Sequence, residues 1–144
     1  MKRILLITAI TGLLSASPVQ AQGDARRGEE AFRQCLACHS LEPELHLTGP
    51  SLIGIVGRPA GKTPDFKRYS TALANADFVW SRETLDRWLE DPEKLVPGTT
   101  MRIRPVTDAG MRQDVIAFLE NYELPESADK NESGMPDLKQ APPG

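Results

Sequence analysis

The apolar residues of this chain recur with helical spacing in three separate segments. The first follows Asp24, a good N-cap, and carries small or apolar residues on one face: Gly28, Ala31, Phe32 and Cys35. The second begins near Ser81, is stopped by Pro92, and has a face of Leu85, Trp88 and Leu89. The third begins near Asp108, is ended by Pro125, and has an apolar face of Met111, Val115, Phe118, Leu119 and Tyr122. The pattern predicts three main helices.

The stretch between the first two helices, residues 40–80, has a different character. It is rich in glycine and proline, and it has no alternating run long enough to build a sheet. Only a short helix over residues 69–76 is expected there. Such a long loop region is unusual in a compact domain, but it becomes reasonable if the loops wrap a large bound group. We therefore expect an all-α domain with long loops around a cofactor.

The two ends of the chain fall outside this domain. Residues 1–21 have a basic start, an apolar run from Ile4 to Leu14 and a small-residue site ending at Ala21, which is the layout of a secretory signal peptide. The run is too short to span a membrane, so we expect cleavage after Ala21 and a soluble periplasmic product with no membrane anchor. Residues 22–124 would form the domain. Residues 125–144 are rich in proline and poor in apolar residues, and we expect a disordered acidic tail.

Composition excludes two classes of protein. The 144 residues include 17 Lys and Arg against 20 Asp and Glu, a net charge of −3, which argues against a nucleic-acid partner. Removal of the signal peptide would take this charge to −5. The two cysteines cannot form the multi-disulfide framework of a small secreted scaffold.

The segment Cys35-Leu36-Ala37-Cys38-His39 carries the chemistry. On a helical turn, both thiols and the imidazole share one side, which suits a macrocycle held by two thioether links and an iron bound by His39. This C-x-x-C-H spacing is typical of c-type haem attachment. A dithiol redox motif is an alternative, but the expected βαβ pattern is missing. Half a zinc site is another, but the only further His or Cys is His46.

An iron bound from one side needs a sixth ligand or an open site. Met101 follows Pro97-Gly98-Thr99-Thr100 in a loop, Met111 lies on the apolar face of the third helix as core filler, and Met135 lies in the tail. Met101 is therefore the expected ligand. A Met/His pair raises the reduction potential and closes the iron to substrates, which favours electron transfer over catalysis.

With these residues in place, the chain resembles a small class I cytochrome c from Gly23 to about Tyr122. The resemblance implies the class I fold, with three main helices and long loops around one covalent haem. It implies that Gly28 lets the first helix cross closely against Phe118, and that the Pro50 carbonyl accepts the second N–H of His39. It also implies that Arg58, Tyr69, Trp80 and Thr99 surround the haem propionates, and that His46 ties loops together.

The sequence also departs from this family. Trp88 stands where a Tyr often donates to the axial sulfur, and we expect that an indole does not reproduce this bond in the same way. Ile103 stands where mitochondrial members carry Phe beside the haem edge. The ring of lysines around that edge is largely replaced by Gln34, Glu93, Thr100 and Asp108, although Lys94 is kept and Arg102 and Arg104 lie nearby.

We therefore expect a monomeric periplasmic electron carrier, not an enzyme, with redox proteins docking over one exposed haem edge. The donor and acceptor are left open. Two alternatives also stay open. One is a haem sensor or peroxidase-like module, which requires Met101 to leave the iron. The other is a cytochrome subunit of a larger oxidoreductase, with the tail as its tether.

Overall fold

The computed structural model describes residues 23–123, so the expected signal peptide and tail lie outside the described residues. The described chain begins with helix α1, Ala25–Phe32, capped by the Asp24 carboxylate, which accepts the backbone N–H groups of Arg26 and Arg27. The α-helix does not continue to Cys35 as its spacing predicted. A 3-10 turn, Arg33–Ala37, follows directly and carries Cys35 in a tighter winding.

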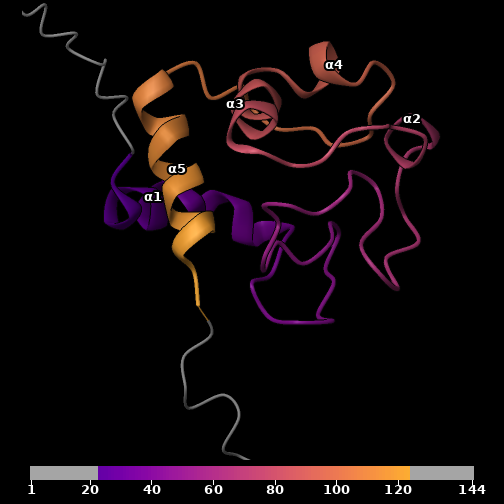
Figure 1. Ribbon diagram of the computed structural model, residues 1–144, viewed down its shortest axis with the longest axis horizontal. Coiled ribbons are helices and arrows are strands. Elements are labelled where there is room, and N and C mark those ends of the chain that lie inside the picture. Colours follow the sequence, from indigo (N-terminus) through magenta and orange to yellow (C-terminus); the bar gives the residue numbers. More distant parts are fainter. Residues whose placement is uncertain (1–22, 124–144) are drawn as a thin grey trace, which may run out of the picture.

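Helix α5, Ala109–Asn121, crosses α1 at close range (Figure 1). Gly28 makes the crossing possible, because a Cβ there would lie 2.0 Å from the Asp114 carbonyl oxygen and 2.8 Å from Phe118 Cβ. The Phe32 and Phe118 rings pack beside this point with centroids 5.2 Å apart. The expected small-against-large packing of Gly28 and Phe118 is confirmed.

Helix α3, Arg82–Glu90, begins with a reciprocal capping box between Ser81 and Thr84 and buries Leu85, Trp88 and Leu89. This matches the predicted helix and its face. Pro92 does more than stop the helix: it opens the short helix α4, Pro92–Leu95, with Asp91 as its N-cap. Proline suits that position because the first turn of a helix has no partner for its missing N–H.

One prediction for α5 is wrong. Met111 is 43% exposed, while Arg112 and Asp114 are only 6% and 7% exposed. The buried face is therefore rotated away from Met111. Both charged residues are neutralised where they lie, since Arg112 pairs with Asp86 on α3 and Asp114 pairs with Arg27 on α1. Paired charges can be buried where a single charge could not.

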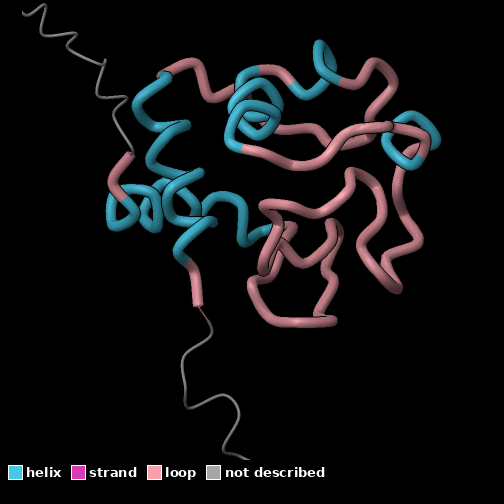
Figure 2. The backbone as a smooth tube through the Cα atoms, viewed as in Figure 1, coloured by secondary structure: helices cyan, strands magenta, loops and turns pink. Residues whose placement is uncertain are grey.

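The remainder of the described chain consists mainly of loops, as Figure 2 shows. Residues 23–123 contain no β-strand, and the one β-bridge joins Pro59 to Val79. The expected short helix is present as α2, Thr71–Ala74, capped by the Ser70 side chain. Within this described range, no helix combines the length and the apolarity needed to cross a membrane.

Candidate functional site

The two cysteines lie in and just after the 3-10 turn that ends the first helical segment. The Cys35 carbonyl accepts the N–H groups of Cys38, at 3.0 Å, and His39, at 2.9 Å, so one backbone oxygen fixes the turn. Cys35 is half-buried and Cys38 is exposed. Burial, together with the neighbouring Cys38, raises the pKa of the Cys35 thiol to about 11. The motif therefore presents two thiols and an imidazole within five residues.

The His39 ring is held in one orientation. Its Nδ1 lies 2.7 Å from the Pro50 carbonyl oxygen, and because a carbonyl can only accept, Nδ1 must carry the proton. Nε2 then keeps its lone pair, as a metal ligand requires. Burial lowers the pKa of His39, against the opposing effect of the Pro50 hydrogen bond, and favours the neutral ring. Gly49 leaves the space, since a Cβ there would lie 2.3 Å from His39 Cε1.

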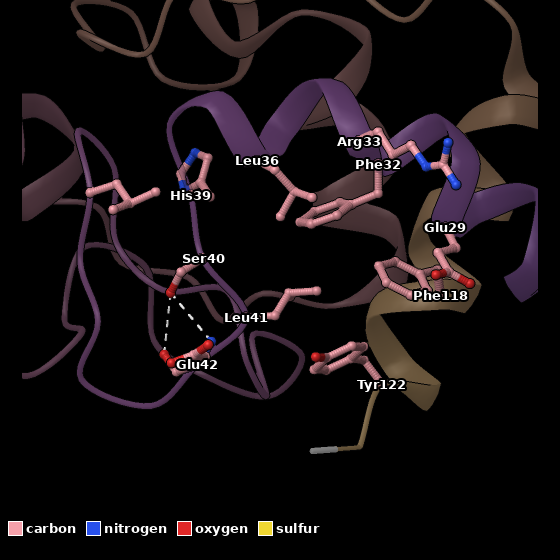
Figure 3. Close-up of a pocket in the computed structure, with 11 residues that line it drawn as sticks. Glu29, Phe32, Arg33, Leu36, His39, Ser40, Leu41, Glu42, Phe118 and Tyr122 are labelled. Atoms are coloured by element: carbon pink, nitrogen blue, oxygen red, sulfur yellow. Dashed lines mark hydrogen bonds between the residues drawn. The ribbon is translucent and has the colours of Figure 1, made fainter. Parts of the chain in front are cut away.

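A hollow of about 440 Å³ lies beside this ring, between the 3-10 turn, the loop after it and α5 (Figure 3). Its apolar lining includes Phe32, Leu41 and Phe118. Three charged residues also border it: Glu29, Arg33 and Glu42. The His39 side of the site therefore adjoins the aromatic pair at the α1–α5 crossing.

Met101 lies in the loop between α4 and α5, and its thioether has a defined partner. The Trp88 indole N–H donates to Met101 Sδ at 3.2 Å, from a side chain that is 5% exposed. We expected that an indole does not reproduce the tyrosine bond in the same way, and the donor is indeed an N–H in place of a hydroxyl, but it does reach the sulfur. Helix α3 also contacts the end of this loop, because the Leu89 carbonyl accepts the Val106 N–H at 2.9 Å. The Met101 N–H donates to the Thr99 hydroxyl at 3.3 Å, and Thr99 is 2% exposed.

Arg58 provides a test of whether the loops fit a bound anionic group. One guanidinium nitrogen donates to the Ser51 carbonyl at 2.8 Å, but Nε is buried with no partner in the described chain. Burial lowers the pKa of Arg58. A buried donor without a partner carries a free-energy cost that an anionic acceptor would remove. The site therefore fits a carboxylate-bearing group such as a haem propionate.

The two predicted aromatic residues lie in the same loop region. The Tyr69 hydroxyl accepts the Thr63 N–H at 3.4 Å, so its own proton is free for another acceptor. Trp80 is 7% exposed and packs edge-on against Trp88, with ring centroids 5.2 Å apart. His46 also has the expected bridging role, since its ring accepts the Ser51 N–H at 3.1 Å and lies 3.0 Å from the Pro64 carbonyl.

Comparison with known proteins identifies the family. No family model matches the chain. Cytochrome c type-1 of Ascaris suum is 42% identical over 104 residues, which cover 72% of this chain and 92% of that protein. Cytochrome c2 of Rhodomicrobium vannielii is 38% identical over 120 residues, covering 83% and 95% respectively. The solved structure of cytochrome cH from Methylobacterium extorquens superposes with a TM-score of 0.66 at 41% identity, covering 69% of this chain and all of that one. This chain belongs to the class I cytochromes c.

A cytochrome c carries one covalently bound haem c with its iron, and the C-x-x-C-H turn occupies the expected place in this one. The cytochrome is accordingly an electron-transfer protein that exchanges electrons with redox partners, and it is not an enzyme. The all-α class I fold expected from the sequence is confirmed.

The buried charged residues of this cytochrome were not predicted from its sequence. Arg112 is one of them, although it shares a helical face with Val115 and Leu119 at spacings of three and seven residues. That signal favoured the side of the helix that the structure buries. Met111 fits the adjacent face of the same helix, and a methionine is a more common core residue than an arginine, so the pattern alone favours Met111.

Proposed function

We propose that this cytochrome is a periplasmic single-electron carrier whose haem is attached to Cys35 and Cys38, with His39 and Met101 as the axial ligands of the iron. The observation that carries the proposal is the fixed tautomer of His39. Its Nδ1–H is directed at the Pro50 carbonyl, which leaves Nε2 as a lone-pair donor within the C-x-x-C-H motif. The Trp88 N–H on the Met101 sulfur supports the second ligand, because it orients the thioether from a buried side chain.

The bound haem supplies the redox chemistry, since its iron alternates between Fe(II) and Fe(III). The protein keeps the ligands in place during this change. Pro50 fixes the His39 ring, and Gly49 allows the loop to pass close to it. Buried, oriented ligands reduce the rearrangement that accompanies a change of oxidation state, and Met/His ligation raises the potential in cytochromes c generally.

The haem propionates would lie among the buried polar groups of the loops. Arg58 offers an Nε–H without a partner, and the Tyr69 hydroxyl has a proton to donate. Trp80 and Thr99 are buried polar side chains that complete this proposed set. Donors of this kind offset the cost of burying a carboxylate.

The proposal includes the fate of the two ends. Residues 1–21 would direct export and be removed, residues 22–124 would form the working domain, and residues 125–144 would be an acidic tail. The protein would act as a soluble monomer that meets its redox partners over one exposed haem edge. The lysine-poor sequence around that edge indicates that these partners are not selected by a strongly acidic docking face.

The ligand set is tested with Met101→Ala in the haem-loaded protein. We expect the oxidised wild type to show the weak far-red sulfur-to-iron charge-transfer band, and the variant to lose it. The variant should also bind carbon monoxide when reduced. Met111→Ala is the matched control, because Met111 is an exposed thioether on α5 and its removal should leave the band unchanged. Survival of the band in Met101→Ala, or tight carbon monoxide binding by the reduced wild type, would contradict the proposed ligation.

A further inference from the structure

The loop that follows Met101 returns to the protein body with few ties of its own. In the described chain, the backbone of residues 102–105 makes no hydrogen bond. The first tie after this stretch is the Val106 N–H, which donates to the Leu89 carbonyl on α3 at 2.9 Å. The Arg102 side chain forms an exposed ion pair with Glu93 at 3.3 Å, and exposed ion pairs contribute little to stability. The stretch therefore gives Met101 little support of its own.

Arg112 of α5 holds this return segment. Its Nη1 donates to the Val106 carbonyl at 2.9 Å and to the Thr107 carbonyl at 3.1 Å. Its Nε donates to Asp86 Oδ1 at 2.8 Å, and Nη2 lies 3.5 Å from Asp86 Oδ2 and 3.9 Å from Glu90. All three guanidinium nitrogens are therefore engaged at once, at a residue that is 6% exposed.

The carboxylate that pairs with Arg112 belongs to α3, the helix whose Trp88 also donates to the Met101 sulfur. Asp86 lies on α3 two residues before Trp88, whose indole donates to Met101 Sδ. Asp86 is itself fixed by the Gln113 side chain, which donates to Oδ1 at 3.0 Å. Helix α3 therefore contacts the Met101 loop at its ligand end through Trp88 and at its return end through the Leu89 carbonyl. At that return end it also orients Arg112 of α5 through Asp86.

We propose that Arg112 is a positioning residue that keeps Met101 on the iron. The proposal rests on the ligation proposed above. Only residues 102–105 separate Met101 from Val106, so an opening large enough to carry Met101 off the iron pulls on Val106 and Thr107. If their carbonyls leave Nη1, a buried guanidinium loses two acceptors. Because a buried charged donor without acceptors is costly, this loss opposes movement of the loop and of the thioether with it.

The test measures how readily an external ligand replaces Met101. Imidazole binds ferric iron only after the thioether leaves, so its apparent affinity reports the fraction of protein in which the loop has opened. In Arg112→Lys, a single ammonium keeps the charge but cannot reach both carbonyls and Asp86 together. We expect imidazole to bind the haem-loaded variant about tenfold more tightly than it binds the wild type, equivalent to about 1.4 kcal/mol.

Glu120→Gln is the matched control. Glu120 of α5 forms an ion pair with Arg82 of α3, so this variant weakens a tie between the same two helices without touching the loop. Its imidazole affinity should stay within about twofold of the wild type. Asp86→Asn is a milder second variant that keeps Arg112 in place, and it should raise the affinity in the same direction as Arg112→Lys. Unfolding by denaturant is measured for each variant to compare global stability.

Three results would overturn the proposal. The first is an unchanged imidazole affinity in a folded Arg112→Lys or Asp86→Asn variant. The second is an equal increase in Glu120→Gln. The third is a wild type that lacks the far-red band, in which case the ligation fails and the role of Arg112 fails with it. If the wild type shows the far-red band but Arg112→Lys binds imidazole no more tightly than Glu120→Gln does, the ligation stands and only the role of Arg112 is overturned.

Discussion

The hydrogen bond from the Trp88 indole to the Met101 sulfur makes a direct prediction about the reduction potential. The N–H lies 3.2 Å from Sδ and withdraws electron density from the sulfur. A thioether that donates less density to the iron stabilises Fe(III) less, and the potential rises. Trp88→Phe keeps an aromatic ring in the space but removes the donor. We therefore expect the potential of the variant to fall.

The size of this fall follows from the strength of the bond. A hydrogen bond of this kind contributes about 0.5–1.5 kcal/mol net, and only the part that differs between the two oxidation states affects the potential. If that part is about 0.5–1 kcal/mol, the potential falls by roughly 20–45 mV, since a tenfold change in a one-electron equilibrium is about 59 mV. The smaller ring also leaves a void beside Trp80, so stability should fall by about 1–3 kcal/mol.

The assay is a spectroelectrochemical titration of the haem-loaded proteins, combined with denaturant unfolding. Leu85→Ala is the control, because Leu85 is a 5% exposed residue of the same helix and its loss creates a cavity without removing the donor. We expect Leu85→Ala to lose stability with little change in potential. A Trp88→Phe potential equal to or above that of the wild type would refute the reasoning. A shift of the same size in Leu85→Ala would attribute the change to packing.

Two further predictions concern the crossing of α1 and α5. Gly28→Ala should destabilise the folded protein by about 3 kcal/mol, because its Cβ would lie 2.0 Å from a backbone oxygen that cannot move freely; denaturant unfolding measures this, and Ala31→Gly is the control on the same helix. Asp114→Asn should lower stability by about 1–3 kcal/mol at neutral pH. Hydrogen bonds from Arg27 and from the Asp24 N–H lower the pKa of Asp114 in the folded protein, so its stabilisation is present above about pH 4 and is lost as the pH falls through the folded pKa. The stability difference between the wild type and Asp114→Asn should therefore narrow as the pH falls below about 4, and a difference that stays constant between pH 3 and 7 would contradict the role of the charge.

Local chemistry made much of the fold predictable. Asp24, Ser81 and Asp108 each begin a helix where the sequence placed one, because an N-cap acts on backbone groups two or three residues away. The C-x-x-C-H spacing identified the cofactor for a similar reason, since the whole motif lies within five residues. The attachment of the haem to Cys35 and Cys38 and the ligation of the iron by His39 and Met101 stay predictions, and the proposed spectra test the Met101 ligand.

The features that sequence reasoning missed depend on distant partners. Arg112 is buried only because Asp86, 26 residues earlier, and the loop carbonyls meet it in space. The Trp88 indole donates to the Met101 sulfur, 13 residues later, and this contact depends on how the loop folds back onto α3, which no spacing along the chain reveals. The helical spacing of Val115 and Leu119 fits both Met111 and Arg112, so the periodicity does not decide which of the two faces the core. Patterns local to one segment give the elements, while the choice of face depends on the rest of the protein.

The crossing of α1 and α5 also sets the order of events when the chain is made. The Asp24 N–H and the Asp114 carboxylate are 90 positions apart in the sequence, and they lie 2.6 Å from each other in the fold. Helix α1 is synthesised first, yet the surface that covers Gly28 and Phe32 belongs to the last helix of the domain. The domain therefore cannot close until almost its whole length has left the ribosome, and a chain cut before residue 109 exposes the face of α1 that α5 covers. A domain closed by its first and last helices completes its fold only after the last helix has emerged.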